Sequence, residues 1–224
     1  MVHPVTTLQP MQTAPSIAPR QRLARPPIVA LVCSAGGLQA LTSVLRPLPE
    51  AFPAAVIALQ HHSPDKPSYV AELLAPKCRL RFSPAHQGTA LRAGTVVVVP
   101  AGKHALVTQG DRLALIRADH SPYRPSADLL LTSLALVAAR RTIAVILSGR
   151  GSDGATGAVA VHGFGGTVIA ADKASSAYSG MPEAAISRGD AVDHVLPVGE
   201  IAALLISLTR CTPSSDRFQD ALNA

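Results

Sequence analysis

IVALVCSAGGLQALTSVL, residues 28–45, is the stretch that we expect to decide the fold. It begins with an unbroken apolar run, turns at a serine followed closely by two glycines, and continues with leucines at spacings of three and four residues. A short apolar run bounded by glycines is typical of a buried strand, and the leucine spacing is typical of one face of a helix. Ser34 is therefore predicted at a strand-to-helix turn, where a serine serves either as a helix N-cap or as a nucleophile.

The composition and the pattern of the whole chain fit one α/β domain. Of the 224 residues, 48% are hydrophobic but only 3% are aromatic, so the core must be built mainly from Ala, Val, Leu and Ile. Apolar runs alternate with helical patterns along the sequence. We therefore expect a doubly wound, mostly parallel sheet with helices on both faces, and a short antiparallel hairpin that turns at residues 109–111.

Three segments are expected along the chain. Residues 1–27 are rich in Pro, Gln, Thr and Ala without periodicity, which is typical of a flexible tail. The alternating pattern occupies residues 28–209, the predicted domain, and residues 210–224 form a predicted C-terminal tail.

Charge excludes some classes of partner. Lys and Arg outnumber Asp and Glu by 20 to 14, but the basic residues are scattered and not interleaved with aromatic residues. This pattern argues against a nucleic-acid partner and is compatible with an acidic protein partner. No apolar run approaches the length of a membrane span, and the N-terminus lacks the apolar middle region of a signal peptide.

The three cysteines are far apart and form no CxxC pair, so we expect neither a zinc site nor a disulfide framework. No cofactor is expected, and a reduced, cytoplasmic setting fits best. Cys33, beside Ser34, is a rival nucleophile or, as the alternative, a small buried hydrophobe.

Three kinds of side chain suited to acyl transfer follow predicted strands: the hydroxyl of Ser34, the imidazole of His61 or His62, and the carboxylate of Asp153. Parallel strands share one direction, so these loops should open at the same edge of the sheet, where α/β sheets bind ligands. A hydroxyl, an imidazole and a carboxylate are the parts of a nucleophilic triad. Each residue also has a structural alternative: His61 as a polar strand cap, and Asp153 as the N-cap of the following helix.

A different function is suggested by residues 149–154, GRGSDG, which match the pattern GxGxxG. The loop follows a predicted strand, opens a helix, and is followed 18 residues after its last glycine by Asp172, as in dinucleotide-binding proteins. Asp153 argues against this alternative, because a carboxylate inside the loop would repel phosphate. The glycines that would approach a pyrophosphate are Gly149, Gly151 and Gly154.

Six short motifs lie in register along the predicted domain. They are SAGGLQAL (34–41), QH (60–61), LRAG through VPAG to His104 (91–104), PSAD (125–128), LSGRGSDGA (147–155) and GMPEAA (180–185). In this order they resemble motifs of the catalytic domain of the CheB-type protein-glutamate methylesterases of bacterial chemotaxis. The resemblance extends from about residue 28 to residue 208, nearly the whole predicted domain.

The resemblance implies a catalytic triad of Ser34, His61 and Asp153. It implies hydrolysis of glutamate γ-methyl esters on the cytoplasmic domain of chemoreceptors, with release of methanol, and in some members deamidation of receptor glutamines. It also implies backbone N–H groups that stabilise the oxyanion. The residues expected to contribute to the oxyanion or substrate site are Ala35, Gly36 and Arg150.

Three residues depart from the family pattern. Arg150 replaces a methionine, Val32 replaces a glycine two residues before the serine, and His62 is atypical in its loop. Arg150 is a large, charged change beside the site, and we hypothesise that it contacts an acidic receptor surface. Arg150 and Val32 keep open a second hypothesis, a CheB-like regulatory or binding module without turnover.

Most members of the family carry a receiver domain before the esterase domain. Only a short segment precedes residue 28 in this sequence. From the resemblance we therefore expect a catalytic domain alone, without phosphorelay control in cis.

Overall fold

The computed structural model describes residues 25–63, 68–118 and 123–210. Most of the two predicted tails, residues 1–24 and 211–224, lies outside this described part, and the predicted domain boundaries stay a prediction. In chain order the helices and strands are β1 (Ile28–Cys33), α1 (Gly37–Leu45), β2 (Ala55–Gln60), α2 (Val70–Leu74), β3 (Arg81–Pro84), β4 (Thr95–Val98), β5 (Lys103–Thr108), β6 (Arg112–Arg117), α3 (Ala127–Ala138), β7 (Thr142–Ile146), α4 (Ala155–Gly163), β8 (Thr167–Ala171), α5 (Gly180–Ile186), β9 (His194–Leu196) and α6 (Ile201–Arg210).

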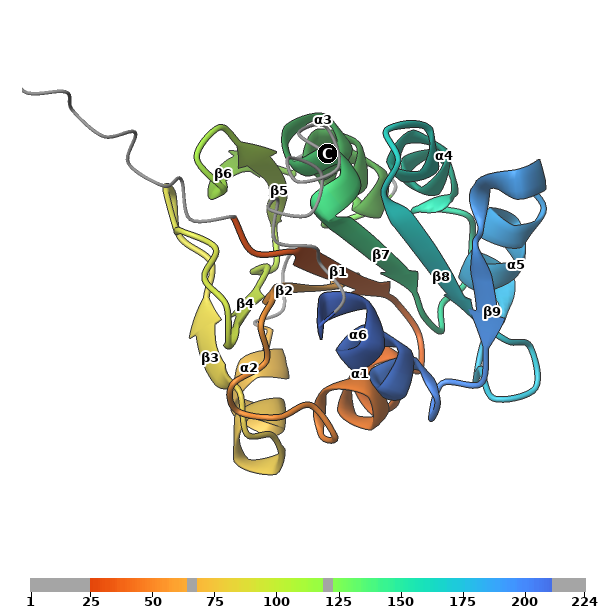
Figure 1. Cartoon of the computed structure of the whole chain (residues 1–224), viewed down its shortest axis with the longest axis horizontal. Helices are drawn as coiled ribbons and strands as arrows, with labels where there is room; N and C mark the ends of the chain where they lie inside the picture. Colours follow the sequence, from red (N-terminus) through yellow and green to blue (C-terminus); the bar gives the residue numbers. More distant parts are fainter. Residues whose placement is uncertain (1–24, 64–67, 119–122, 211–224) are drawn as a thin grey trace, which may run out of the picture.

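The strands form a seven-stranded parallel sheet in the order β3-β4-β2-β1-β7-β8-β9, and β5 and β6 form a separate antiparallel hairpin. Helices α1, α2 and α6 cover one face of the sheet, and α3, α4 and α5 lie on the other (Figure 1). The expected fold class, doubly wound with helices on both faces and a short hairpin, is confirmed. Helix α3 ends at Ala138, because Ala139 leaves the helical region with φ of 47°.

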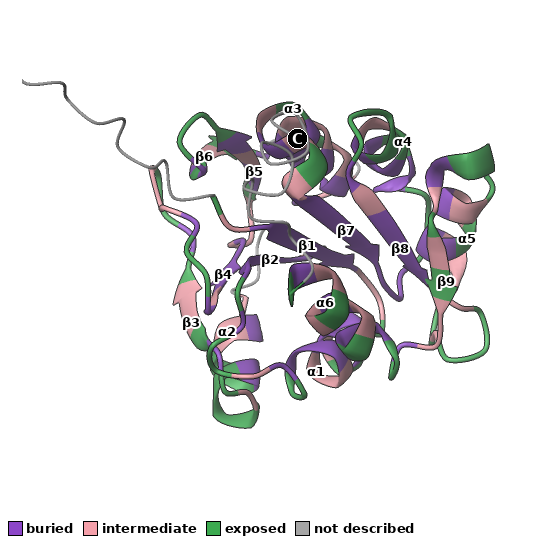
Figure 2. Ribbon diagram, viewed as in Figure 1, coloured by how far each residue is buried: buried purple, intermediate pink, exposed green. Residues whose placement is uncertain are grey.

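Strand β1 lies at the centre of the sheet and is buried along its whole length (Figure 2). Its side chains alternate between two hydrophobic cores, one on each face of the sheet. A strand covered on both faces must be apolar at every position, which accounts for the unbroken run in the sequence. Ile28, Ala30 and Val32 belong to the core with α3 and α4, and Val29, Leu31 and Cys33 to the core with α1 and α6.

The chain changes direction across the sheet between β1 and β7. From β1 it continues to the neighbouring β2, then to β3 at the edge of the sheet and to β4 between β3 and β2, and it crosses to the other side of β1 at β7. In open α/β sheets ligands bind at such a switch point, outside the carboxyl ends of the strands. The loops after β1, β2 and β7 therefore surround the expected site.

The turn after β1 depends on close packing of glycine. The N-cap of α1 is Gly36, with φ of 73° and no side-chain capping bond. The alternative that Ser34 caps this helix is therefore wrong. Gly37 begins the helix directly against Cys33, and an added Cβ there would lie 2.4 Å from the cysteine sulfur.

In the described part of the chain, we find no helix with the length and apolar character needed to cross a membrane.

Replacing Gly37 by alanine is expected to lower the free energy of unfolding by about 1–3 kcal/mol, the usual cost of overpacking. The methyl group would collide with the side chain of Cys33, so α1 would have to move away from β1. Urea unfolding followed by circular dichroism measures the change. Gly163→Ala is the matched control, since a Cβ there meets nothing within 4 Å. Equal stabilities of the two variants would contradict the close approach at Gly37.

Candidate active site

The register of β1 and β2 brings Ser34 and His61 side by side. Cys33 pairs with Gln60 in the parallel ladder, so Ser34 and His61 are the next residues on the two strands. The backbone continues this pairing, because His61 N–H donates to the Cys33 carbonyl at 3.0 Å. On the other side, Ser34 N–H donates to the carbonyl of Ser148, in the loop after β7, at 2.9 Å.

Ser34 and His61 open into one pocket with a volume of about 210 Å³. Among the described residues, no group of the protein forms a hydrogen bond with the Ser34 hydroxyl. The pocket is lined by Ser34, His61, His62, Tyr123, Arg124 and Arg150.

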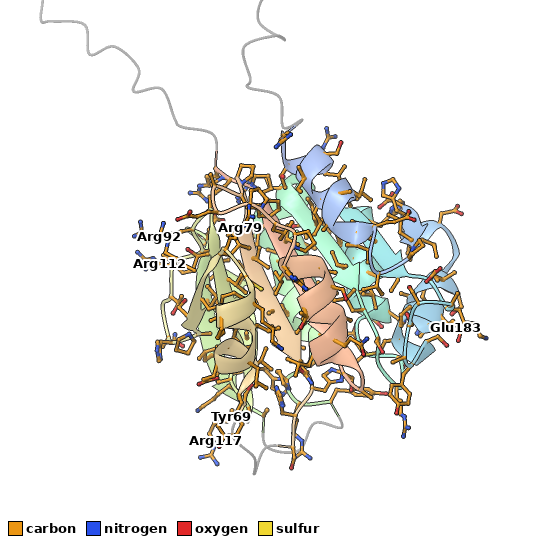
Figure 3. The ribbon with its side chains drawn as sticks, turned by 90° about the horizontal axis from the view of Figure 1, so that it is seen from below. Tyr69, Arg79, Arg92, Arg112, Arg117 and Glu183 are labelled. Carbon is orange, nitrogen blue, oxygen red and sulfur yellow. The ribbon has the colours of Figure 1, made fainter. Side chains whose placement is uncertain are left out.

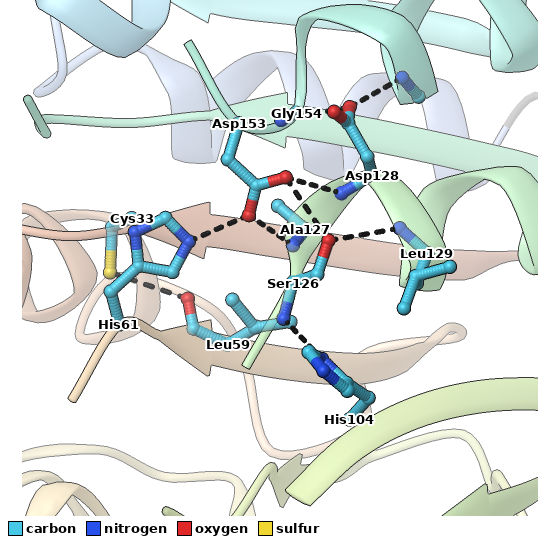
Figure 4. Close-up of polar contacts among 11 residues, drawn as sticks. Cys33, Leu59, His61, His104, Ser126, Ala127, Asp128, Leu129, Asp153 and Gly154 are labelled. Atoms are coloured by element: carbon cyan, nitrogen blue, oxygen red, sulfur yellow. Dashed lines mark hydrogen bonds and ion pairs between the residues drawn. The ribbon is translucent and has the colours of Figure 1, made fainter. Parts of the chain in front are cut away.

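His61 is joined to Asp153 across 92 residues of sequence. Its Nε2 lies 2.8 Å from Asp153 Oδ2, with side-chain exposures of 11% for His61 and 2% for Asp153 (Figure 4). An ionised carboxylate only accepts hydrogen bonds, so Nε2 carries the proton and Nδ1 keeps the lone pair. Tyr123 stacks on the imidazole with 5.5 Å between ring centroids, which restricts the orientation of the ring.

The N-terminus of α3 holds the carboxylate of Asp153. Asp153 Oδ2 also accepts from Ala127 N–H at 2.6 Å, and Oδ1 accepts from Asp128 N–H at 3.0 Å and from the Ser126 hydroxyl at 3.2 Å (Figure 4). Burial opposes ionisation of Asp153, but the hydrogen bonds from His61, Asp128 and Ala127 outweigh it and lower the pKa of this carboxyl. The unpaired N–H groups of a helix start favour negative charge, so the site keeps Asp153 ionised.

A carboxylate of α3, that of Asp128, accepts hydrogen bonds from the N-terminus of α4. Asp128 Oδ1 accepts from Gly154 N–H at 2.9 Å and from Gly157 N–H at 2.7 Å. The alternative that Asp153 caps its own following helix is therefore wrong. Asp153 accepts hydrogen bonds from the N-terminus of α3, and Asp128 accepts them from the start of α4. Burial, with the nearby charge of Asp153, raises the pKa of Asp128.

The same contact argues against the dinucleotide alternative. The pyrophosphate of such a ligand would need the first N–H groups of α4, which already donate to Asp128. The glycine loop is also packed against protein, because an added Cβ would lie 2.1 Å from Met181 Sδ at Gly149 and 2.8 Å from the Tyr123 hydroxyl at Gly151.

Two other side chains that could take part in catalysis, Cys33 and His62, contact other groups of the protein. Cys33 is fully buried, its thiol contacts the Leu59 carbonyl at 3.5 Å, and burial strongly raises its pKa, so it is not a competent nucleophile. His62 Nε2 lies 3.0 Å from the Ser68 hydroxyl, and burial together with the charge of His61 lowers its pKa. His61, rather than His62, is thus the histidine that meets Asp153.

Three further residues support the site, and no role was predicted for them from the sequence: Ser126 and Asp128, which belong to the PSAD motif, and Tyr123. Ser126 also accepts from Leu129 N–H as the N-cap of α3, and its own N–H donates to Nδ1 of the buried His104 at 2.9 Å. Nδ1 can accept only in a neutral ring, and burial lowers the pKa of His104 despite the nearby charge of Asp153. A serine before a helical pattern predicts an N-cap, but nothing local shows that the same helix start holds a carboxylate from a distant loop.

The backbone around Ser34 supplies hydrogen-bond donors. Among the described residues, the N–H groups of Ala35, Gly36 and Arg150 donate no hydrogen bond to another group of the protein. They therefore remain available to a negatively charged oxygen. In the part of the chain that the structure describes, no group of three His, Cys, Asp or Glu side chains is placed to hold a metal ion.

Comparison with known proteins identifies the class. Residues 29–205 match the family model of the CheB methylesterase domain. The structure superposes on the Thermotoga maritima CheB methylesterase catalytic domain with a TM-score of 0.78 and 34% identity, over 82% of this chain and 99% of that one. The chain therefore belongs to the CheB methylesterase family.

Named relatives are longer than this chain. It is 41% identical, over 84% of its length, to protein-glutamate methylesterase/protein-glutamine glutaminase 2 of Anaeromyxobacter dehalogenans, and covers 55% of that protein. It is 39% identical, over 92% of its length, to protein-glutamate methylesterase FrzG of Myxococcus xanthus, and covers 60% of that protein. The chain thus spans between half and two thirds of these relatives.

Asp153→Asn is expected to reduce stability in a pH-dependent way. Because the folded-state pKa of Asp153 lies below the ordinary value of about 3.9, its ionised form stabilises the fold above that pH, and this contribution is lost as pH falls through the lowered pKa. We expect Asp153→Asn to be less stable than wild type by about 2 kcal/mol at about pH 6, with the difference shrinking below about pH 4. Urea unfolding at several pH values measures it. The exposed Asp190→Asn is the control, and a difference at Asp153 that does not change with pH would contradict the anchoring.

Proposed function

We propose that this chain hydrolyses glutamate γ-methyl esters on the cytoplasmic domain of methylated chemoreceptors and releases methanol. The observation that carries the proposal is the hydrogen bond from His61 Nε2 to the anchored carboxylate of Asp153, beside a Ser34 hydroxyl that no group of the described residues binds. Relatives about 40% identical are named protein-glutamate methylesterases, which supports the same reaction here. Some are also named protein-glutamine glutaminases, and attack on a glutamine side chain would use the same groups.

The first half of the reaction begins at Ser34. His61 Nδ1 has the free lone pair, since Nε2 donates to Asp153, and it accepts the Ser34 proton as Oγ attacks the ester carbonyl. His61 then returns this proton to the departing methoxide, which leaves as methanol. The product of this half is an ester between Ser34 and the glutamyl γ-carbonyl.

The second half repeats the sequence with water. His61 Nδ1 takes a proton from water, hydroxide attacks the acyl-enzyme, and the glutamate side chain leaves as Ser34 recovers its proton. Each tetrahedral intermediate carries a negative oxygen. Stabilisation by a backbone N–H such as that of Ala35, Gly36 or Arg150 is worth about 3 kcal/mol per donor in comparable sites.

Asp153 stabilises the imidazolium that forms in both halves. Its carboxylate is held by four hydrogen bonds, three of which come from the first residues of α3. It therefore needs no reorganisation when His61 becomes charged. The orientation differs from the chymotrypsin arrangement, in which Nδ1 faces the aspartate and Nε2 faces the serine.

The alternative of a module without turnover rested on Val32 and Arg150. Val32 is fully buried in the core with α3 and α4, away from the pocket that Ser34 lines. Arg150 lines that pocket but leaves the contact between His61 and Asp153 in place. We also propose a cytoplasmic setting, because Cys33 and Cys78 are free thiols.

Ser34→Ala is expected to abolish methanol release from a methylated chemoreceptor cytoplasmic fragment, a loss on the order of 10⁴-fold or more. The adjacent Cys33→Ala is the matched control and should retain activity, because the buried thiol stays protonated. Methanol release is measured with both variants beside wild type. Loss of activity in Cys33→Ala with activity retained in Ser34→Ala would overturn the assignment of the nucleophile.

A further inference from the structure

The rim of the Ser34 pocket carries an arginine without an acidic partner. Arg150 is exposed and lines the pocket with Ser34, His61 and Arg124. No acidic residue of the described chain lines this pocket. Among the described residues, the guanidinium of Arg150 forms no hydrogen bond or ion pair, so its five N–H donors face no protein acceptor.

The guanidinium is nevertheless held in place. Its central carbon lies 4.4 Å from the centroid of the Tyr178 ring, a cation–π contact. The Tyr178 backbone is bound to the loop that carries Arg150: Tyr178 N–H donates to the Ser148 hydroxyl, and its carbonyl accepts from Gly149 N–H, both at 2.9 Å. Tyr178 thus preorganises a positive charge two residues from Ser148, whose carbonyl pairs with Ser34.

No carboxylate of the described residues pairs with this charge. Asp153, the acidic residue nearest in sequence to Arg150, is 2% exposed and accepts four hydrogen bonds already. A free guanidinium presents a planar fork that matches a carboxylate. The group that pairs with it must therefore arrive with the substrate.

We propose that Arg150, positioned by Tyr178, forms a carboxylate subsite that selects glutamyl methyl esters lying one helical turn from an unesterified acidic side chain. The inference rests on the proposed function, with the ester carried on a helical segment of the receptor. On a helix, residues three or four apart lie about 5–6 Å from each other, so an ester at Ser34 brings its neighbour to the rim of the same pocket. The enzyme would then bind two groups of the substrate at once, the ester carbonyl at Ser34 and the neighbouring carboxylate at Arg150.

The test compares two helical peptides that carry one glutamate methyl ester and, four residues away, either glutamate or glutamine. We expect wild type to favour the glutamate peptide in kcat/KM by roughly fivefold at low salt, the effect of one partly exposed ion pair, and less at high salt. Arg150→Met should remove this preference whatever its effect on the overall rate, and Arg150→Glu should reverse it.

Arg92→Met is the matched control, because it makes the same change of charge. Arg92 is exposed and precedes β4, at the amino edge of the sheet, and Figure 3 shows it well above Tyr69, which follows β2. This variant should keep the preference of wild type.

The outcomes distinguish a failure of the carboxylate subsite from a failure of the esterase function. If wild type hydrolyses both peptides equally, or if Arg150→Met keeps the preference, the carboxylate subsite is wrong while the esterase function stands. If wild type releases methanol from neither peptide nor from a methylated receptor fragment, the proposed function fails and the subsite fails with it.

Discussion

The site depends on one interaction, the hydrogen bonding of the Asp153 carboxylate to the N-terminus of α3. A buried carboxylate is costly unless its oxygens are hydrogen-bonded, and here backbone N–H groups and the Ser126 hydroxyl supply the bonds. The same N–H groups have no partner within their own helix, so one contact satisfies both sides. His61 then has a fixed acceptor for Nε2, and its other nitrogen is left for the chemistry.

The return contact, from Asp128 to the start of α4, makes the arrangement reciprocal. Helices α3 and α4 lie side by side on one face of the sheet, and each N-terminus is satisfied by a carboxylate from the other helix or the loop that precedes it. Two carboxylates so close repel each other, which is consistent with the opposite directions of their pKa changes. Of the two carboxyl groups, Asp153, which faces His61, is therefore the one whose pKa is lowered.

Prediction from sequence succeeded where a local pattern carries the information. The unbroken apolar run of β1 predicted a strand covered on both faces, and the loops after β1, β2 and β7 were expected at one edge because parallel strands share a direction. The N-cap assignments failed for Ser34 and Asp153, since a helix start can be satisfied by a glycine turn or by a distant residue as well as by its own N-cap. The residues alone also left the choice between His61 and His62 open, although the resemblance favoured His61; in the structure His61 contacts Asp153 and His62 contacts Ser68.

The sequence by itself determined the α/β class, the order of the strands along the chain, and the placement of Ser34, His61 and Asp153 in loops that follow buried strands. Periodicity and glycine turns are local properties, and they suffice for these conclusions. Only the tertiary structure decided which nitrogen of His61 meets Asp153, which helix holds that carboxylate, and that the Arg150 guanidinium lies on Tyr178. These contacts join residues from separate loops, and no local pattern encodes which distant groups the packing of the sheet and helices brings together.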